Sequence, residues 1–93
     1  MNNNDSRGEL GHLPDDSAAA YEQAIEILRA LVAVLNARAD HARDPAAAEQ
    51  LRADAVQYAA EQRQLRATDH AAIARVVSQY PAKVRELRAA LPQ

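Results

Sequence analysis

Two Asp–His pairs are the residues of this chain whose types could bind a metal ion. The pairs are Asp40–His41 and Asp69–His70, and His12 is the one further histidine. Carboxylate and imidazole groups are ligands for several divalent metals. Neither pair, however, belongs to an HxxxH or ExxH pattern that would place a second ligand on the same helical face. We therefore interpret the histidines as surface residues, those of the two pairs at helix ends, and predict no metal site and no cofactor.

Glu22 and Glu26 are spaced to share one helical face, and paired carboxylates can perform acid–base chemistry when they are buried together. Here they lie on the polar side of an amphipathic segment, where Glu26 also shares a face with Arg29, and this position favours a solvated surface. The chain contains no cysteine, which excludes disulfides, thiol catalysis and cysteine-based zinc sites. It also has no glycine-rich phosphate loop. We predict no catalytic residue and a protein that is not an enzyme.

Three basic residues, Lys83, Arg85 and Arg88, follow Pro81 near the end of the chain. The apolar residues around them resemble the skeleton of helix-turn-helix DNA-binding motifs, at Ile73, Ala74, Val77, Val84 and Leu87. This resemblance covers residues 71–91. It implies that Pro81 opens a recognition helix whose basic side chains contact phosphates or base edges. DNA binding through this segment is the alternative function.

The surroundings of Pro81 favour one continuous, kinked helix over this alternative. Ser78 stands in the turn where helix-turn-helix motifs often have glycine, Glu86 interrupts the basic residues, and the net charge is −2. A proline inside a helix costs ~3 kcal/mol. Burial of one apolar side chain stabilises the fold by roughly 1.5–3 kcal/mol. A continuous helix keeps three such side chains on its apolar stripe, which together outweigh the cost of the proline: Val84, Leu87 and Leu91.

The elements that would position these residues are three helices rich in alanine, leucine and arginine, which are strong helix formers. The first begins with Ser17 as N-cap and runs to about residue 42. The second follows the Asp44–Pro45 start signal and reaches about residue 66. The third is capped by Thr68 or Asp69 and ends before Pro92. The chain is therefore predicted to be all-α.

Large side chains repeat every seven residues in each predicted helix, and this repeat predicts how the helices pack. Chain reversals centred at residues 43 and 69 align the repeats into three layers: Tyr21/Leu65/Ile73, Leu28/Tyr58/Tyr80 and Leu35/Leu51/Leu87. Both centres coincide with predicted turns. The sequence thus predicts an antiparallel up-down-up three-helix bundle with coiled-coil-like packing, whose third helix is kinked at Pro81.

The three tyrosines could also be interpreted as a stacking platform for nucleic-acid bases. All of them fall on the seven-residue stripes instead, which favours core positions for Tyr21, Tyr58 and Tyr80. Their hydroxyl groups should then reach the surface or a polar partner, for which Gln62 is one candidate.

The start of the chain differs in composition from the rest. Residues 1–14 contain both glycines and no helical periodicity, which predicts a flexible polar tail ahead of a single domain at residues 15–93. Residues 1–26 carry six acidic side chains and one arginine. The sequence shows no signal peptide and no apolar run long enough to span a membrane. Together with the lack of cysteine this favours the cytoplasm, and the excess of arginine and alanine is typical of a GC-rich bacterial genome.

The first helix has more apolar surface than the second can cover. Its large apolar side chains occupy about half of the helical circumference, whereas the second helix offers three large groups padded by alanine. We expect the uncovered side to contact another molecule, through Ile27, Leu31 and Val34. The predicted function is a non-enzymatic interaction module, acting as adaptor, regulator or assembly component. Its partner would be a second copy in a homodimer, or another helical protein.

Overall fold

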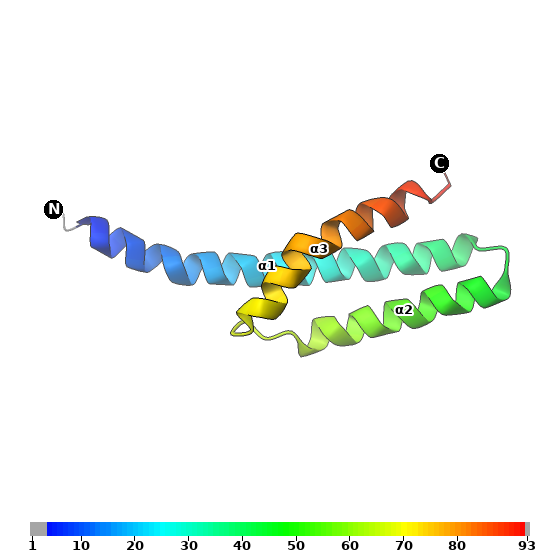
Figure 1. The fold of residues 1–93 in the computed structure, drawn as a ribbon, viewed down its shortest axis with the longest axis horizontal. Helices are drawn as coiled ribbons and strands as arrows, with labels where there is room; N and C mark the ends of the chain where they lie inside the picture. Colours follow the sequence, from blue (N-terminus) through cyan, green and yellow to red (C-terminus); the bar gives the residue numbers. More distant parts are fainter. Residues whose placement is uncertain (1–3, 93) are drawn as a thin grey trace.

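The computed structural model describes the backbone of residues 4–92 and the side chains of residues 17–92. The described part of the chain consists of three helices without strands: α1 (Asn4–His41), α2 (Pro45–Gln64) and α3 (His70–Ala89) (Figure 1). The prediction of an all-α chain with three helices is confirmed. Ser17 is an internal residue of α1 rather than its N-cap. The flexible tail predicted for residues 1–14 lies outside the residues whose side chains are described.

Aspartate side chains start α2 and α3, as their positions in the sequence predict. The Asp44 carboxylate accepts the backbone N–H of Ala46 at 3.3 Å, and Pro45 fills the first helical position. Asp69 likewise accepts the backbone N–H of Ala72 at 3.2 Å. Each cap satisfies a backbone donor that the first helical turn leaves without a partner.

Pro81 lies inside α3, which continues as one helix from His70 to Ala89. The division into two helices that the helix-turn-helix resemblance implies is therefore not present. The apolar stripe explains this result, because Ile73, Val76 and Val84, on both sides of the proline, are all buried. Their burial outweighs the hydrogen bond that an internal proline removes.

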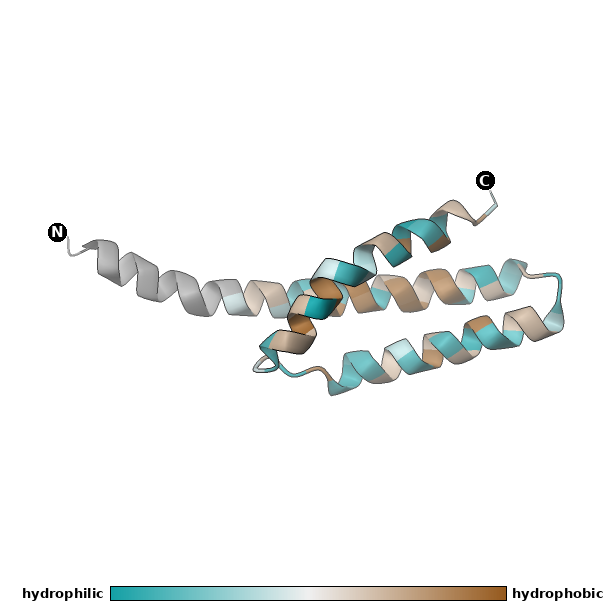
Figure 2. Ribbon diagram, in the orientation of Figure 1, coloured by the Kyte–Doolittle hydropathy of each residue, from teal (hydrophilic) through white to brown (hydrophobic). Residues whose placement is uncertain are grey.

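The helix α1 is the centre of the packing. It packs against both α2 and α3, whereas no Cα atom of α2 comes within 8 Å of one in α3. In Figure 1, α2 returns alongside α1 after a short loop, and α3 crosses α1. Figure 2 shows hydrophobic and hydrophilic residues interspersed along α1, α2 and α3. The fold is thus more open between α2 and α3 than a bundle in which every pair of helices touches.

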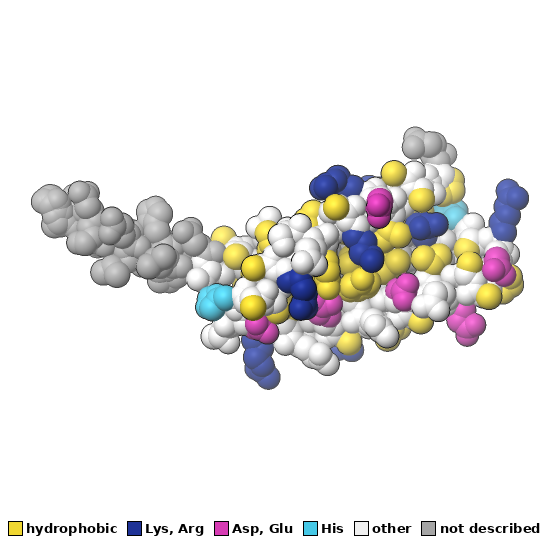
Figure 3. All heavy atoms as spheres, in the orientation of Figure 1, with side chains coloured by type: hydrophobic (Ala, Val, Ile, Leu, Met, Phe, Trp, Pro, Cys, Tyr) yellow, Lys and Arg dark blue, Asp and Glu magenta, His cyan; other side chains and the backbone are white. Residues whose placement is uncertain are grey.

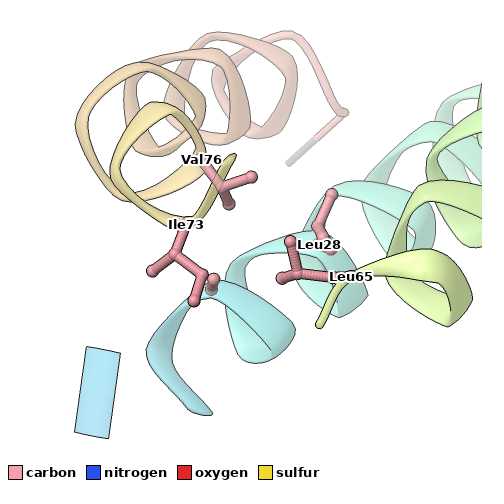
Figure 4. Packing of buried hydrophobic residues seen from close by; sticks show 5 residues of the cluster. Leu28, Leu65, Ile73 and Val76 are labelled. Atoms are coloured by element: carbon pink, nitrogen blue, oxygen red, sulfur yellow. The ribbon is translucent and has the colours of Figure 1, made fainter. Parts of the chain in front are cut away.

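Two hydrophobic clusters form the core, and the residues of each predicted layer fall within one of them. The first cluster contains two predicted layers, Tyr21/Leu65/Ile73 and Leu28/Tyr58/Tyr80. Figure 4 shows Leu28 of α1 and Leu65, the residue after α2, packed near Ile73 and Val76 of α3. The second cluster holds the remaining layer, namely Leu35, Leu51 and Leu87.

Candidate protein-interaction surface

The separation of α2 from α3 leaves a hollow along the molecule, which we call the α2–α3 trough. Its volume is about 450 Å³, and its lining consists of Leu35, Asp54, Gln57, Tyr58, Glu61, Tyr80 and Lys83. Figure 3 shows hydrophobic side chains gathered in the space between α3 and α2, with charged side chains beside them. Its two aromatic residues, Tyr58 and Tyr80, stay only partly buried. Leu35 and the rings of Tyr58 and Tyr80 supply its apolar lining, and the other four lining side chains are polar or charged.

Two tyrosine side chains meet across the trough, although the backbones of α2 and α3 stay apart. The rings of Tyr58 from α2 and Tyr80 from α3 meet edge to face, with centroids 5.5 Å apart and planes at 80°. This is a favourable arrangement for aromatic pairs. The tyrosines are therefore part of the core's edge, as the seven-residue repeat predicts, and both remain half-buried.

Glu61 of α2 accepts hydrogen bonds from two side chains of α3. The Tyr80 hydroxyl donates to the Glu61 carboxylate and lies 3.2 Å from each oxygen. Arg75 forms an ion pair with the same carboxylate at 3.3 Å. Burial, and then the charge of Glu61, raises the pKa of Tyr80, because both disfavour the phenolate. The pKa of Arg75 is also raised, chiefly by its hydrogen bond to Glu61.

This cluster was missed by the sequence analysis, which had suggested Gln62 as a partner for a tyrosine hydroxyl. Gln62 instead donates its side-chain amide to the backbone carbonyl of Ile25, 3.3 Å away, and so joins α2 to α1. The seven-residue repeat, which aligns Tyr58 with Tyr80, could have predicted the Glu61 cluster. It places Glu61, about one turn beyond Tyr58, within reach of Tyr80.

Opposite charges occupy the two edges of the trough. Asp54 lies on α2, where it accepts a hydrogen bond from Gln50 at 3.0 Å. Lys83 lies on α3, and its Nζ atom is 6.0 Å from the centre of the Tyr58 ring, a cation–π contact. Both residues line the same hollow. The trough therefore has an acidic edge on α2 and a basic edge on α3.

A second hollow lies between α1 and α3, and we call it the α1–α3 groove. It has a volume of about 320 Å³ and is lined by Gln23, Glu26, Ile27, Ala30, Pro81, Val84, Arg85 and Arg88. Glu26 forms an exposed ion pair with Arg29. Pro81 is half-buried here, so its ring contributes to an apolar surface.

The three residues predicted to form a contact surface do not share one environment. Leu31 is 0% exposed and Val34 is 5% exposed, and both belong to the core cluster that includes Val84 of α3. The expectation of an uncovered surface was wrong for these two, because α3 covers the side of α1 that α2 leaves open. Ile27 is half-buried and lines the α1–α3 groove, so it alone keeps accessible surface.

The basic residues of the DNA-binding alternative are also divided between surfaces. Lys83 lines the α2–α3 trough, whereas Arg85 and Arg88 line the α1–α3 groove. All three are exposed. A single basic face that could follow a phosphate backbone is therefore not formed by these three side chains.

The described histidines lie at separate helix ends. His41 is the last residue of α1, and His70 is the first residue of α3. Within the described residues, no three histidine or carboxylate side chains are grouped so that they could hold a metal ion. His12 lies outside the residues whose side chains are described.

Known proteins offer no guide to the role of these surfaces. No protein family, curated protein or solved structure matches this chain. None of the described helices is both long and apolar enough to cross a membrane.

Proposed function

We propose that this chain is a non-enzymatic helical interaction module that self-associates through the α2–α3 trough. The observation that carries the proposal is the gap between α2 and α3, which leaves Tyr58 and Tyr80 only half-buried in the lining of the trough. A second copy laid against the trough would remove more of that surface from water, at roughly 25 cal/mol per Å². α1 would contribute through Leu35 in the lining, rather than through Leu31 and Val34.

The architecture that we propose for this module is the antiparallel up-down-up bundle with a kink at Pro81. The three residue layers support it, because each predicted set packs within one of the two core clusters. The interior position of Pro81 in α3 supports the kink, since proline removes a helical hydrogen bond there.

Light scattering on the purified full chain over a wide concentration range tests the proposal. We expect the mean mass to rise from one chain to two. Gln57→Arg should shift the equilibrium toward the monomer, because it places a long charged side chain in the trough lining. Gln64→Arg is the matched control, since Gln64 is exposed on α2 and lies outside that lining. A wild-type chain that stays monomeric at every concentration would refute self-association.

DNA binding by Lys83, Arg85 and Arg88 stays a prediction from the sequence, and no feature of the described fold favours it. A titration with random duplex DNA at two salt concentrations tests it directly. Phosphate contacts would weaken steeply with salt, and replacing Arg85 and Arg88 by alanine would reduce that slope.

A further inference from the structure

Asp54 and Lys83 are the two charged residues of the trough that have no ion-pair partner within the described chain. The ion pairs among residues 17–92 are Arg29–Glu26, Arg52–Asp40 and Arg75–Glu61. The last pair joins the helices at the Tyr80 end of the trough and uses the charge of Glu61 internally. Asp54 and Lys83 therefore remain available for a charge on another molecule.

These two residues also stand at the same level along the trough, on opposite edges. Asp54 falls between Leu51 and Tyr58 on α2, and Lys83 falls between Tyr80 and Leu87 on α3. Tyr58 packs on Tyr80, while Leu51 and Leu87 belong to one core cluster. The neighbours of Asp54 on α2 therefore lie opposite the neighbours of Lys83 on α3, which places Asp54 and Lys83 at the same level along the trough.

We propose that a second copy of this chain docks trough to trough, about a two-fold axis that runs along the trough. This inference rests on the proposed function and specifies its geometry. A rotation about this axis places the α2 edge of one copy over the α3 edge of the other. It keeps the position of each residue along the trough unchanged. Asp54 of each copy then pairs with Lys83 of the partner subunit, and the pair forms twice.

The alternative axis, which runs across the trough, is disfavoured by the same charges. It would place α2 over α2 and α3 over α3, so that acidic edge faces acidic edge and basic edge faces basic edge. Like charges opposed at an interface weaken association and exclude the arrangement that brings them together. Tyr58 and Tyr80 would lie at the centre of the favoured interface, where aromatic residues are enriched.

Charge reversal tests the geometry, with the dissociation constant of the dimer as the measurement. Asp54→Lys alone and Lys83→Glu alone each turn two attractive pairs into two repulsive ones. Each variant should weaken its own dimer at least about tenfold. An equimolar mixture of the two variants should recover a dissociation constant within about threefold of the wild type. In the mixed dimer, the lysine introduced at position 54 faces the glutamate introduced at position 83, and the native pair re-forms on the other side.

Matched controls separate this effect from a change of net charge. Glu49→Lys and Arg63→Glu reverse exposed charges of α2 that lie outside the trough lining, and both should leave the dissociation constant unchanged. Circular dichroism of every variant checks that the helices are retained.

The outcomes distinguish the geometry from self-association itself. A wild-type monomer at all concentrations overturns both proposals. A wild-type dimer that tolerates either reversal, or a mixture that fails to recover, overturns the two-fold axis along the trough and leaves self-association standing. Single reversals that leave the dissociation constant unchanged, together with a mixture that binds more tightly than the wild type, would point to the axis across the trough, because that axis opposes position 54 of one copy to position 54 of the other.

Discussion

The two helices that pack on α1 achieve their contacts with different side chains. The buried residues within α2 are Ala48 and Ala55, whereas those of α3 are Ile73, Val76 and Val84. Alanine allows the α2 backbone to approach α1 closely, while α3 covers α1 with branched side chains. The larger residues of α2, Leu51 and Tyr58, lie at the side of this contact and stay half-buried.

This difference explains where the trough comes from. A helix that approaches through small residues leaves its large residues beside the interface, and here Tyr58 lines the gap toward α3. The helix α3 meanwhile covers the wide apolar arc of α1. Leu31 and Val34 of α1 are therefore buried, whereas Tyr58 and Tyr80 stay partly accessible between α2 and α3.

Leu31→Ala probes the interface of α1 with α3 and should have the largest effect. Leu31 is completely buried beside Val84, so truncation leaves a cavity. We expect the free energy of unfolding to fall by about 2–5 kcal/mol, a large share of the stability of a small domain. Chemical denaturation measures it.

Val56→Ala provides the control for this prediction, because Val56 is 65% exposed. Its effect should stay within about 0.5 kcal/mol, as for ordinary surface positions. Equal effects of the two substitutions would mean that α3 does not cover α1 at Leu31.

Ala55→Leu probes the other interface, in which small size is the requirement. Ala55 is 3% exposed, so a larger side chain must push α2 away from α1. We expect a loss of about 1–3 kcal/mol in the free energy of unfolding. Ala53→Leu makes the same change at an exposed position of α2 and should be nearly neutral. If Ala55→Leu were tolerated as well, close approach would not be what holds α2.

The parts of this fold that the sequence predicts are those that depend on neighbours along the chain. Asp44 and Asp69 identify helix starts because a cap is a contact with the next few residues. The seven-residue repeat likewise identifies which face of each helix is apolar. Both kinds of signal are local; the structure confirms the caps at Asp44 and Asp69, whereas the cap predicted at Ser17 was wrong.

The parts that the sequence does not predict depend on the angle at which α3 crosses α1. That angle comes from how side chains of separate helices interlock, and several solutions fit one apolar stripe. It determines that Leu31 and Val34 are covered, and that Val76 is fully buried while Val77 is half-buried. The Glu61 cluster is equally non-local, because its donors come from another helix.

Tyr80→Phe tests the polar link across the trough and should have a moderate effect. The substitution removes the donor to Glu61 and leaves the ring in place. We expect a loss of about 0.5–1.5 kcal/mol in the free energy of unfolding, typical of one intramolecular hydrogen bond. A double-mutant cycle with Glu61→Ala isolates the interaction. Strict additivity of the two changes would show that the hydroxyl and the carboxylate do not interact.

The smallest effect should appear at alkaline pH, because the pKa of Tyr80 is raised in the folded chain. Above the ordinary tyrosine pKa of 10.0, the unfolded chain loses the phenolic proton while the folded chain still holds it. Stability that is complete below that pH should therefore decline as the pH rises toward the pKa of the folded state. Denaturation midpoints measured on both sides of that pH report the decline. Tyr80→Phe, which has no proton to lose at this position, should show a weaker decline than the wild type. Identical pH profiles for the two proteins would mean that burial and Glu61 leave the phenol as acidic in the folded chain as in the unfolded one.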